Sequence, residues 1–481
     1  VDCGLGTHTI DISESVGMVN ITTQGGTNDN INLSNVEGDV SLNLGAANHN
    51  IDIQDTKAGK FEDINGVETS WVGDVAITIA GDGNKRINVT NTAGSVKSSV
   101  TEATGGTEVD ITNTGVDVTI VTQDTTQGTF NVIGTDGSVK VASGNGLHNI
   151  NIIDTDVGVT IDCGVGSHAM DLLDTDGDVT IETDGGGVEE INVTNTQGGV
   201  SINSTGDADQ DFNITSTGGD VTIDSANGTH GIYVQNTSQD VTIQTLKSNA
   251  KSVDVFINAC DNLIVATSNG KDSIKIDQIR GDQKITTFDG DDTIIIHSVA
   301  VDAVLNIDAG LISGISGSQK DNNNIDIHGL LAANANISGG YGDDVIVLFD
   351  TESSALSNRM VEDENDAVLL NYQLNITSGT GNDNITVTTT GEGTELFIDA
   401  GLHNDIIKIL GLRGNAMVHG GNSGTNKISV DARFPGNETM NTMDGTTLSY
   451  YGGDGEDYLD TYFVSSGTTN LNVIDDNTGP K

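Results

Sequence analysis

Several residue types that stabilise other classes of protein are scarce in this chain. It has 2 Pro, 3 Cys and 1 Trp among 481 residues, and aromatic residues make up 4%. Three cysteines exclude a disulfide-rich scaffold. The sequence has no run of about 18 apolar residues, so we expect no membrane-spanning helix and no membrane insertion.

Basic residues are also few. Lys and Arg number 19 against 70 Asp and Glu, which gives a formal net charge of −51. A surface this acidic repels nucleic acid and anionic lipid and attracts cations. We therefore expect no nucleic-acid partner.

The chain is rich in a short repeated phrase. Gly/Asp-Val-Thr-Ile or a variant recurs at intervals of mostly 20–22 residues, for example at Val179, Val200 and Val221. About ten residues later comes a second phrase, which is INVTNT at both 87–92 and 191–196. Repeats of this period are typical of solenoids.

Both phrases alternate apolar and polar residues, which is the period of a β-strand. Gly-rich turns separate them, and no helical apolar stripe of useful length is present. The sequence therefore predicts an all-β, parallel β-solenoid (β-helix or β-roll-like) of about twenty coils of 20–22 residues, stacked at ~4.8 Å. We expect a regular solenoid over 1–265, with an insertion near 54–72, and a less regular one over 266–481, with an insertion near 349–371.

One polar column marks the end of the second strand in many coils. By alternation we expect it to point inward at a corner. Stacked amides could form a hydrogen-bonded ladder between coils, or these could be turn residues that tolerate left-handed backbone. The column contains Asn35, Asn91, Asn113, Asp154, Asp174, Asn195 and Asn236.

The turns before the second strand change in the later half of the chain. The stretch GGYGDDVIV at 339–347 has Gly and Asp at fixed spacing, and related stretches begin at 268, 288, 378 and 452. They resemble the RTX nonapeptide, Gly-Gly-x-Gly-x-Asp-x-apolar-x, of calcium-binding β-rolls. The resemblance covers about a third of the chain, mostly after residue 265.

The resemblance implies Ca²⁺ held between successive turns at one edge of the solenoid. Calcium takes six to eight oxygens, which glycine-rich turns and Asp side chains supply. RTX rolls have about 18 residues per coil and the motif on both edges, whereas this chain has longer coils and one such edge. Gly-rich turns that merely suit the corner are the alternative. The implied metal-site residues are Asp272, Asp292, Gly339, Gly340, Gly342, Asp344, Asp383, Asp457 and, by a looser match, Asp405.

The first half carries other residues at the same position. Lys85 cannot bind calcium, and of the five His only His148 and His168 lie in neighbouring coils. Two His without a further ligand favour a polar corner over a transition-metal site. Cys3 and Cys163 share a column about seven coils apart, so a disulfide between them is excluded. The first-half position holds His8, Asp29, His49, Lys85, Thr107, His148, His168, Glu189 and His230.

The sequence predicts a structural protein and not an enzyme. Basic residues do not cluster beside carboxylates, and the familiar nucleophile, phosphate-loop and zinc-protease motifs are absent. The alternative is a carbohydrate-active parallel β-helix of the lyase or epimerase type. Ice binding would need a regular outward array of Thr, and the column next to Thr180 and Thr222 is mixed.

We expect the chain at the cell surface or outside the cell, as part of a filament, surface layer or adhesin. The first residues begin within a coil, and neither terminus resembles a polar cap. This leads to the expectation of end-to-end assembly. The expected partners are copies of the chain or neighbouring segments of a longer chain, with cell-surface polysaccharide as a further partner.

Overall fold

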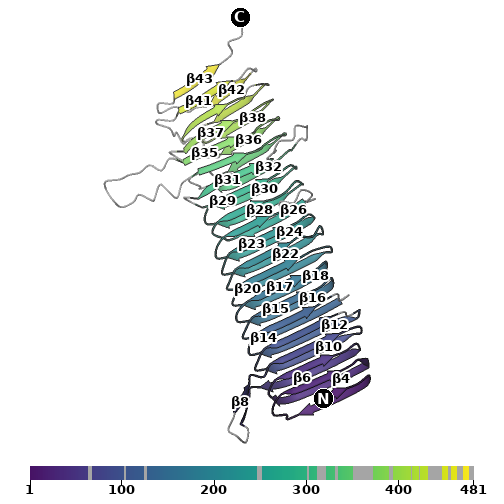
Figure 1. Cartoon of the computed structure of the whole chain (residues 1–481). Helices are drawn as coiled ribbons and strands as arrows, with labels where there is room; N and C mark the ends of the chain where they lie inside the picture. Colours follow the sequence, from purple (N-terminus) through teal and green to yellow (C-terminus); the bar gives the residue numbers. More distant parts are fainter. Residues whose placement is uncertain are drawn as a thin grey trace, which may run out of the picture. The chain divides into compact units, whose positions relative to one another are not determined.

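The computed structural model contains parallel strands stacked in successive coils (Figure 1). Contacts divide the chain into two compact units, Val1–His230 and Gly231–Lys481. The division expected near residue 265 rests on turn sequences and stays a prediction. The structure describes all residues except 63–67, 102–103, 124–126, 246–251, 301–302, 311–320, 331–333, 350–371, 389–393, 413, 422, 432–446, 453–456, 463–469 and 476–481.

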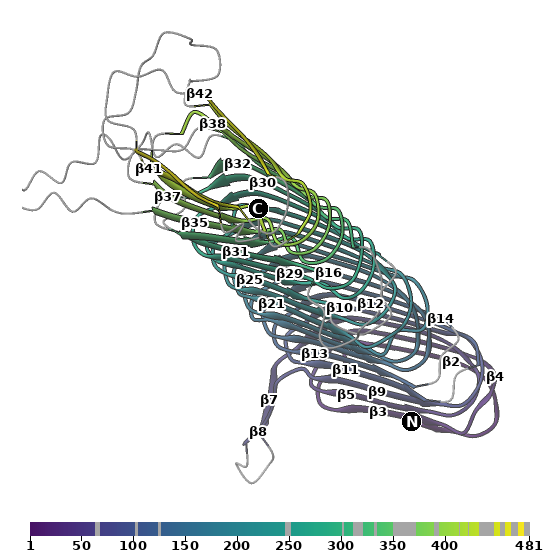
Figure 2. The ribbon, with the colours of Figure 1, turned by 90° about the horizontal axis from the view of Figure 1, so that it is seen from above.

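In the first unit each regular coil contributes one strand to sheet A and one to sheet B, and neighbouring strands of a sheet are parallel. Figure 2 shows the two sheets on different sides of the coils. Sheet A contains β1 (Asp2–Cys3), β3 (Val19–Thr23), β5 (Val40–Leu44), β9 (Val75–Ala80), β11 (Val96–Thr101), β13 (Val118–Thr122), β15 (Val139–Ser143), β17 (Val159–Cys163), β19 (Val179–Thr183), β21 (Val200–Ser204) and β23 (Val221–Ser225). Sheet B contains β2 (Gly6–Ser13), β4 (Gly26–Glu37), β6 (Asn48–Lys57), β10 (Lys85–Thr92), β12 (Gly106–Thr114), β14 (Gln127–Thr135), β16 (Gly146–Thr155), β18 (Gly166–Thr175), β20 (Glu189–Thr196) and β22 (Gln210–Thr217).

The second unit repeats this arrangement, again with parallel pairing. β24 (Thr229–Thr237) contains the boundary between the units. Sheet A contains β25 (Val241–Gln244), β27 (Leu263–Ala266), β29 (Gln283–Thr287), β31 (Val304–Ala309), β33 (Asn334–Ser338), β35 (Tyr372–Thr377), β37 (Thr394–Asp399), β39 (Asn415–His419), β41 (Thr447–Gly452) and β43 (Asn470–Asp475). Sheet B contains β26 (Ser252–Asn258), β28 (Ser273–Ile279), β30 (Thr293–Val299), β32 (Asn324–Leu330), β34 (Val345–Phe349), β36 (Asn384–Thr388), β38 (Ile406–Leu410), β40 (Lys427–Asp431) and β42 (Tyr458–Tyr462).

The core of each coil lies between its two strands. In β19 Val179 and Ile181 are buried, while Glu182 is exposed. In β20 Ile191 and Val193 are buried in the same alternating way. Parallel stacking therefore places each apolar residue on an equivalent one in the next coil, and the predicted β-solenoid is confirmed.

The polar column at the end of the sheet B strands was expected to point inward, and this prediction is wrong. Asn91 and Asn113 are exposed, and each has a φ of 55°. Their left-handed backbone breaks the alternation and turns the next residue inward, so Thr92 and Thr114 are buried. The column is nevertheless a ladder, because Asn113 Nδ2 donates to Asn91 Oδ1 at 2.9 Å. The two interpretations left open by the sequence therefore both hold.

The segment near 54–72 contains an antiparallel hairpin, β7 (Gly59–Glu62) and β8 (Glu68–Trp71), which projects from the coils (Figures 1 and 2). The segment near 349–371 lies outside the described residues except for its first residue. Cys163 and Cys260 are buried thiols, and burial raises the pKa of each to about 12. Among the described residues no helix has the length and apolar character to cross a membrane.

Candidate calcium-binding column

The residues of interest form what we call the corner column, the inward position at the start of each sheet B strand. Strand register places one residue of the column in each coil. In the second unit its members are Val253, Asp272, Asp292, Asn323, Asp344, Asp383, Asp405, Asn426 and Asp457. In the first unit they are His8, Asp29, His49, Lys85, Thr107, Gly128, His148, His168, Glu189 and Gln210, with His230 at the boundary.

Backbone hydrogen bonds link the second unit's column from coil to coil. The Asp344 amide donates to Asp383 Oδ1 at 2.8 Å, and the Asp383 amide donates to Asp405 Oδ1 at 2.9 Å. The same bond joins Asp272 to Asp292 at 2.8 Å. One oxygen of each accepting carboxylate is therefore used by the fold itself. The sequence-predicted aspartates do lie in one stack.

The other carboxylate oxygen faces an environment without donors. Asp344 and Asp405 are each 1% exposed, and the Oδ2 atom of each has no hydrogen-bond partner among the described residues. Burial, together with neighbouring carboxylates such as Asp383, raises the pKa of Asp344 to about 8 and that of Asp405 to about 7. An ionised, unpaired carboxylate at such a depth is costly, so these groups need a proton or a metal cation.

Three further aspartates of the column, Asp272, Asp292 and Asp383, also have raised pKa values. Burial raises the pKa of Asp272 to about 6 and that of Asp292 to about 7, although the hydroxyls of Thr267 and Thr287 offset part of each shift. The pKa of Asp383 is raised for the same reason. Burial therefore disfavours the charged form of these five aspartates in the absence of a cation.

The glycine turn brings backbone oxygens to these carboxylates. A Cβ added at Gly339 would lie 2.6 Å from Asp344 Oδ2 and 3.0 Å from the Ser378 carbonyl oxygen. A Cβ at Gly310 would lie 2.7 Å from Asp321 Oδ2 and 3.3 Å from the Gly339 carbonyl oxygen. Because neither glycine has a Cβ, a carboxylate oxygen and a carbonyl oxygen can approach the turn backbone closely, and these are the two ligand types that calcium prefers. At Gly310 the Asn323 Nδ2 atom lies near the same point, at 3.4 Å.

Gly340 and Gly342 also meet a steric requirement of the stacked turns, while their implied role at a metal site stays a prediction. Their φ angles are 91° and 124°, a region that favours glycine. A Cβ at Gly340 would meet the Ala309 oxygen at 2.3 Å, and one at Gly342 would meet the Asp321 oxygen at 2.0 Å. These two glycines permit close stacking of successive turns.

Sequence comparison with the nonapeptide missed three residues. Asn323 and Asn426 occupy the column where the turn sequences depart from the repeat, and their Nδ2 groups donate to the carbonyls of Gly339 and Gly420. Asp321 stands in a turn where neighbouring coils have glycine, and burial raises its pKa to about 7. The alternation of the following strand, NIDIHGL at 324–330, was the signal that could have located Asn323.

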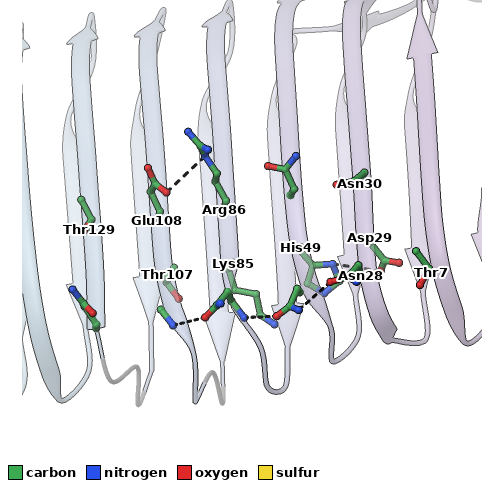
Figure 3. Close-up of a pocket in the computed structure, with 15 residues that line it drawn as sticks. Thr7, Asn28, Asp29, Asn30, His49, Lys85, Arg86, Thr107, Glu108 and Thr129 are labelled. Atoms are coloured by element: carbon green, nitrogen blue, oxygen red, sulfur yellow. Dashed lines mark hydrogen bonds and ion pairs between the residues drawn. The ribbon is translucent and has the colours of Figure 1, made fainter.

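In the first unit donors fill the same column. Figure 3 shows Asp29, His49, Lys85 and Thr107 at one end of successive strands. Lys85 is 1% exposed, and its Nζ donates to the Asp82 carbonyl at 2.8 Å and to the Ala47 carbonyl. Burial lowers its pKa to about 8. An ammonium group therefore lies among turn carbonyls at this coil.

In other coils of this unit, imidazole side chains donate hydrogen bonds to the turn carbonyls, as Lys85 does. Nε2 of His148 lies 3.0 Å from the Gly144 carbonyl, and Nε2 of His168 lies 2.9 Å from the Gly164 carbonyl, so each Nε2–H donates. The two rings stack at 5.3 Å with their planes 1° apart. Burial lowers both pKa values and keeps the rings neutral. Parallel rings do not direct their Nδ1 atoms at one shared ion, which favours the polar-corner interpretation.

The two acids of the first unit's column have donors around them. The His8 amide donates to Asp29 Oδ1 at 3.2 Å, and the His8 ring Nδ1 lies 2.7 Å from the same oxygen. Glu189 Oε2 accepts from Thr183 Oγ1 at 2.9 Å and Ser204 Oγ at 3.0 Å. Asp29 Oδ2 also accepts from Thr23 Oγ1 at 3.2 Å, so both oxygens of Asp29 are bonded within the chain. Glu189 Oε1 has no hydrogen-bond partner among the described residues, and burial raises the pKa of Glu189, so this residue shares the unpaired oxygen of Asp344 and Asp405.

A groove of about 770 Å³ lies over this part of the first unit (Figure 3). Its exposed charged groups are Arg86 and Glu108, whose closest charged atoms are 3.7 Å apart. Glycoside hydrolysis uses two carboxyl groups about 5–9 Å apart, and the lining offers one carboxylate on the surface. The expectation that the chain is not an enzyme, and the lyase or epimerase alternative, stay predictions.

The corner column fits calcium better than a transition metal. Within the described part of the chain, no three His, Cys, Asp or Glu side chains gather closely enough to hold a metal ion. A calcium ion here would take one or two carboxylates of the stack, with Asp344 and Asp383 as examples, and backbone carbonyls for its other ligands. Hard oxygen donors without imidazole or thiolate select such a cation.

Comparisons with known proteins were made at three levels. No protein-family model, no curated protein and no solved structure matches the chain. The fold and the corner column therefore rest on the geometry described above.

Proposed function

We propose that the chain is a structural, non-catalytic β-solenoid segment of an extracellular or cell-surface protein, such as a filament, surface layer or adhesin, and that Ca²⁺ stabilises its second unit. The observation that carries the proposal is the column of buried aspartates with raised pKa values, in which the Oδ2 atoms of Asp344 and Asp405 have no hydrogen-bond partner among the described residues. Ca²⁺ would neutralise this column and connect successive turns.

The proposed class of site supports a location outside the cell. Calcium modules with few carboxylates per ion bind with Kd values on the order of 10⁻⁴–10⁻³ M, which suits extracellular calcium. The resemblance to RTX turns supports the same assignment. End-to-end assembly and contact with cell-surface polysaccharide are further expectations of the sequence, and electron microscopy of the native material is their direct test.

The test is calcium binding by the full chain. After treatment with EGTA, equilibrium dialysis at pH 7.5 against millimolar CaCl₂ should show several ions bound per chain. The double variant Asp344→Asn/Asp383→Asn should bind fewer, because two adjacent carboxylates are lost. Asp254→Asn/Asp460→Asn, which changes two exposed acids of the same unit, is the matched control. Equal binding by wild type and both variants would exclude the column as the site.

A further inference from the structure

The outer face of sheet A in the second unit carries two adjoining depressions. Their volumes are about 540 and 490 Å³, and Asn375 lines both. Register shows that they follow one outward column, so we call the pair the sheet A groove. The column contains Lys284, Asn306, Asn336, Asn375, Phe397, Met417 and Ser449.

One half of the sheet A groove is an amide ladder. Asn336 Nδ2 donates to Asn306 Oδ1 at 2.9 Å, and Asn375 Nδ2 donates to Asn336 Oδ1 at 2.8 Å. A side-chain amide has two N–H groups and two carbonyl lone pairs, so each retains hydrogen-bonding capacity toward solvent. These groups repeat at the coil spacing of ~4.8 Å, which is close to the length of one sugar residue.

The other half contains an apolar patch among polar side chains. Phe397 and Met417 line the depression, and Met417 is 39% exposed. The ring of His419 lies 5.2 Å from that of Phe397 and 4.8 Å from that of Tyr451. In a chain with 4% aromatic residues, three rings on one outer face form a distinct surface. Aromatic rings offer the flat apolar area on which the C–H faces of sugars pack.

Charge indicates the class of ligand. Each depression is lined by a single carboxylate, Glu395 in one and Asp308 in the other, and Lys284 lies beside Asp308. The lining is therefore nearly neutral in a chain whose net charge is −51. The negative charge of the chain would repel an acidic polymer. A neutral, hydroxyl-rich polymer would not be repelled, and its hydroxyls and ring faces could contact the Asn side chains and the Phe397 ring of the groove.

We propose that the sheet A groove binds a neutral polysaccharide that runs along the stacking direction of the coils. Sugar hydroxyls would pair with the amide ladder, and one sugar ring would pack on Phe397. This binding goes beyond the calcium proposal and involves no residue of the corner column.

The test uses the full chain with 2 mM CaCl₂ and three hexasaccharides in isothermal titration calorimetry. These are β-1,4-linked glucose, β-1,4-linked mannose and α-1,4-linked galacturonate. We expect at least one neutral hexamer to bind saturably and the galacturonate hexamer not to bind. Because calcium binding is measured separately by dialysis, failure of either proposal is distinguishable from failure of the other.

Two variants locate the binding site. Phe397→Ala should weaken the neutral hexamer about tenfold, through loss of the stacking surface, and Asn375→Ala should weaken it by a smaller factor. Phe349→Ala removes an aromatic ring that is 38% exposed on sheet B and should leave binding unchanged. Thermal melts check that each variant is folded. Lack of binding by both neutral hexamers, preference for galacturonate, or wild-type affinity in both groove variants would overturn the proposal.

Discussion

The two units build the same backbone corner and fill it with opposite chemistry. In the first unit Lys85, His148 and His168 donate to turn carbonyls, so the corner is closed by internal hydrogen bonds. In the second unit Asp344 and Asp405 each place a carboxylate oxygen without a hydrogen-bond partner in the corner, and at Asp344 the Ser378 carbonyl oxygen lies close by. A corner made of acceptors alone needs a cation from outside the chain.

The difference shows how a repeat fold can acquire ion dependence without a change of architecture. One residue per coil decides whether the corner is satisfied internally or by a metal. Asn323 and Asn426 support this view, because amides at the same column in the second unit donate to carbonyls again. The substitutions below exchange the two chemistries.

The largest effect is expected from Lys85→Asp, which places the second unit's chemistry in the first unit. In calcium-free buffer the new carboxylate would face the Ala47 and Asp82 carbonyls, at a cost of about 3–5 kcal/mol. Urea unfolding should show this loss, and millimolar calcium should restore part of it. Lys97→Asp, at an exposed position on sheet A, is the control. Wild-type stability of Lys85→Asp without calcium would contradict the comparison.

The reverse exchange is Asp344→Asn. The amide can donate where the carboxylate cannot, so in EGTA at pH 8 we expect the variant to be more stable than wild type by about 1–3 kcal/mol. Its gain in melting temperature on addition of calcium should be smaller than that of wild type. Asp254→Asn, on an exposed position of β26, should behave as wild type. If the variant is less stable than wild type in EGTA, the buried Asp344 carboxylate does not destabilise the calcium-free fold, and the comparison fails.

The two units should respond to pH in opposite directions when calcium is absent. The pKa of Asp344 is raised to about 8 and that of Asp292 to about 7, so the folded second unit holds protons that the unfolded chain releases, and its stability falls as pH rises through 6–8. The pKa values of His148 and His168 are lowered, so these residues reduce the stability of the first unit as pH falls below about 6.5, whereas the raised pKa of Glu189 acts in the opposite direction. Two imidazoles against one carboxyl group leave acid sensitivity as the expected net response around β16 and β18.

Hydrogen exchange in EGTA at pH 5.5 and pH 8, corrected for intrinsic rates, measures both trends in one sample. At pH 5.5 peptides of the second unit should gain protection and peptides of the first should lose it. A parallel response of the two units would count against the opposite chemistries.

The smallest effect is expected from His148→Phe. Phenylalanine keeps the stacking with Phe130 and His168 but cannot donate to the Gly144 carbonyl, so we expect a loss of about 1 kcal/mol at pH 8. The variant should also lose part of the first unit's acid sensitivity. His297→Phe, which changes a partly exposed imidazole of the second unit, is the control. An unchanged acid midpoint would show that His148 does not titrate on unfolding.

The sequence predicted the coils and the aspartate stack well, because both depend on strict periodicity. Alternation fixed the inward faces of strands such as β19, and the Gly-Asp spacing located Asp344 and Asp383 in one column. Alternation failed at Asn91, where a left-handed residue shifts the pattern by one.

Other parts of the site depend on contacts between atoms of different coils. The spacing of residues along the chain does not show which atoms make these contacts. The tasks of Gly340 and Gly342 follow from carbonyls of another coil. The Lys85 ammonium donates to carbonyls from two coils. The sequence of its own turn does not indicate that it also contacts the preceding coil. Asn323 was missed because its turn departs from the repeat.

The most direct measurement is hydrogen exchange of the full chain at pH 7.5, with 2 mM calcium and with EGTA. We expect calcium to slow exchange by tenfold or more in peptides that cover 268–300, 338–349, 376–388 and 394–410, and to leave 139–225 unchanged. Absence of calcium protection in the second unit, or equal protection in both units, would contradict the account.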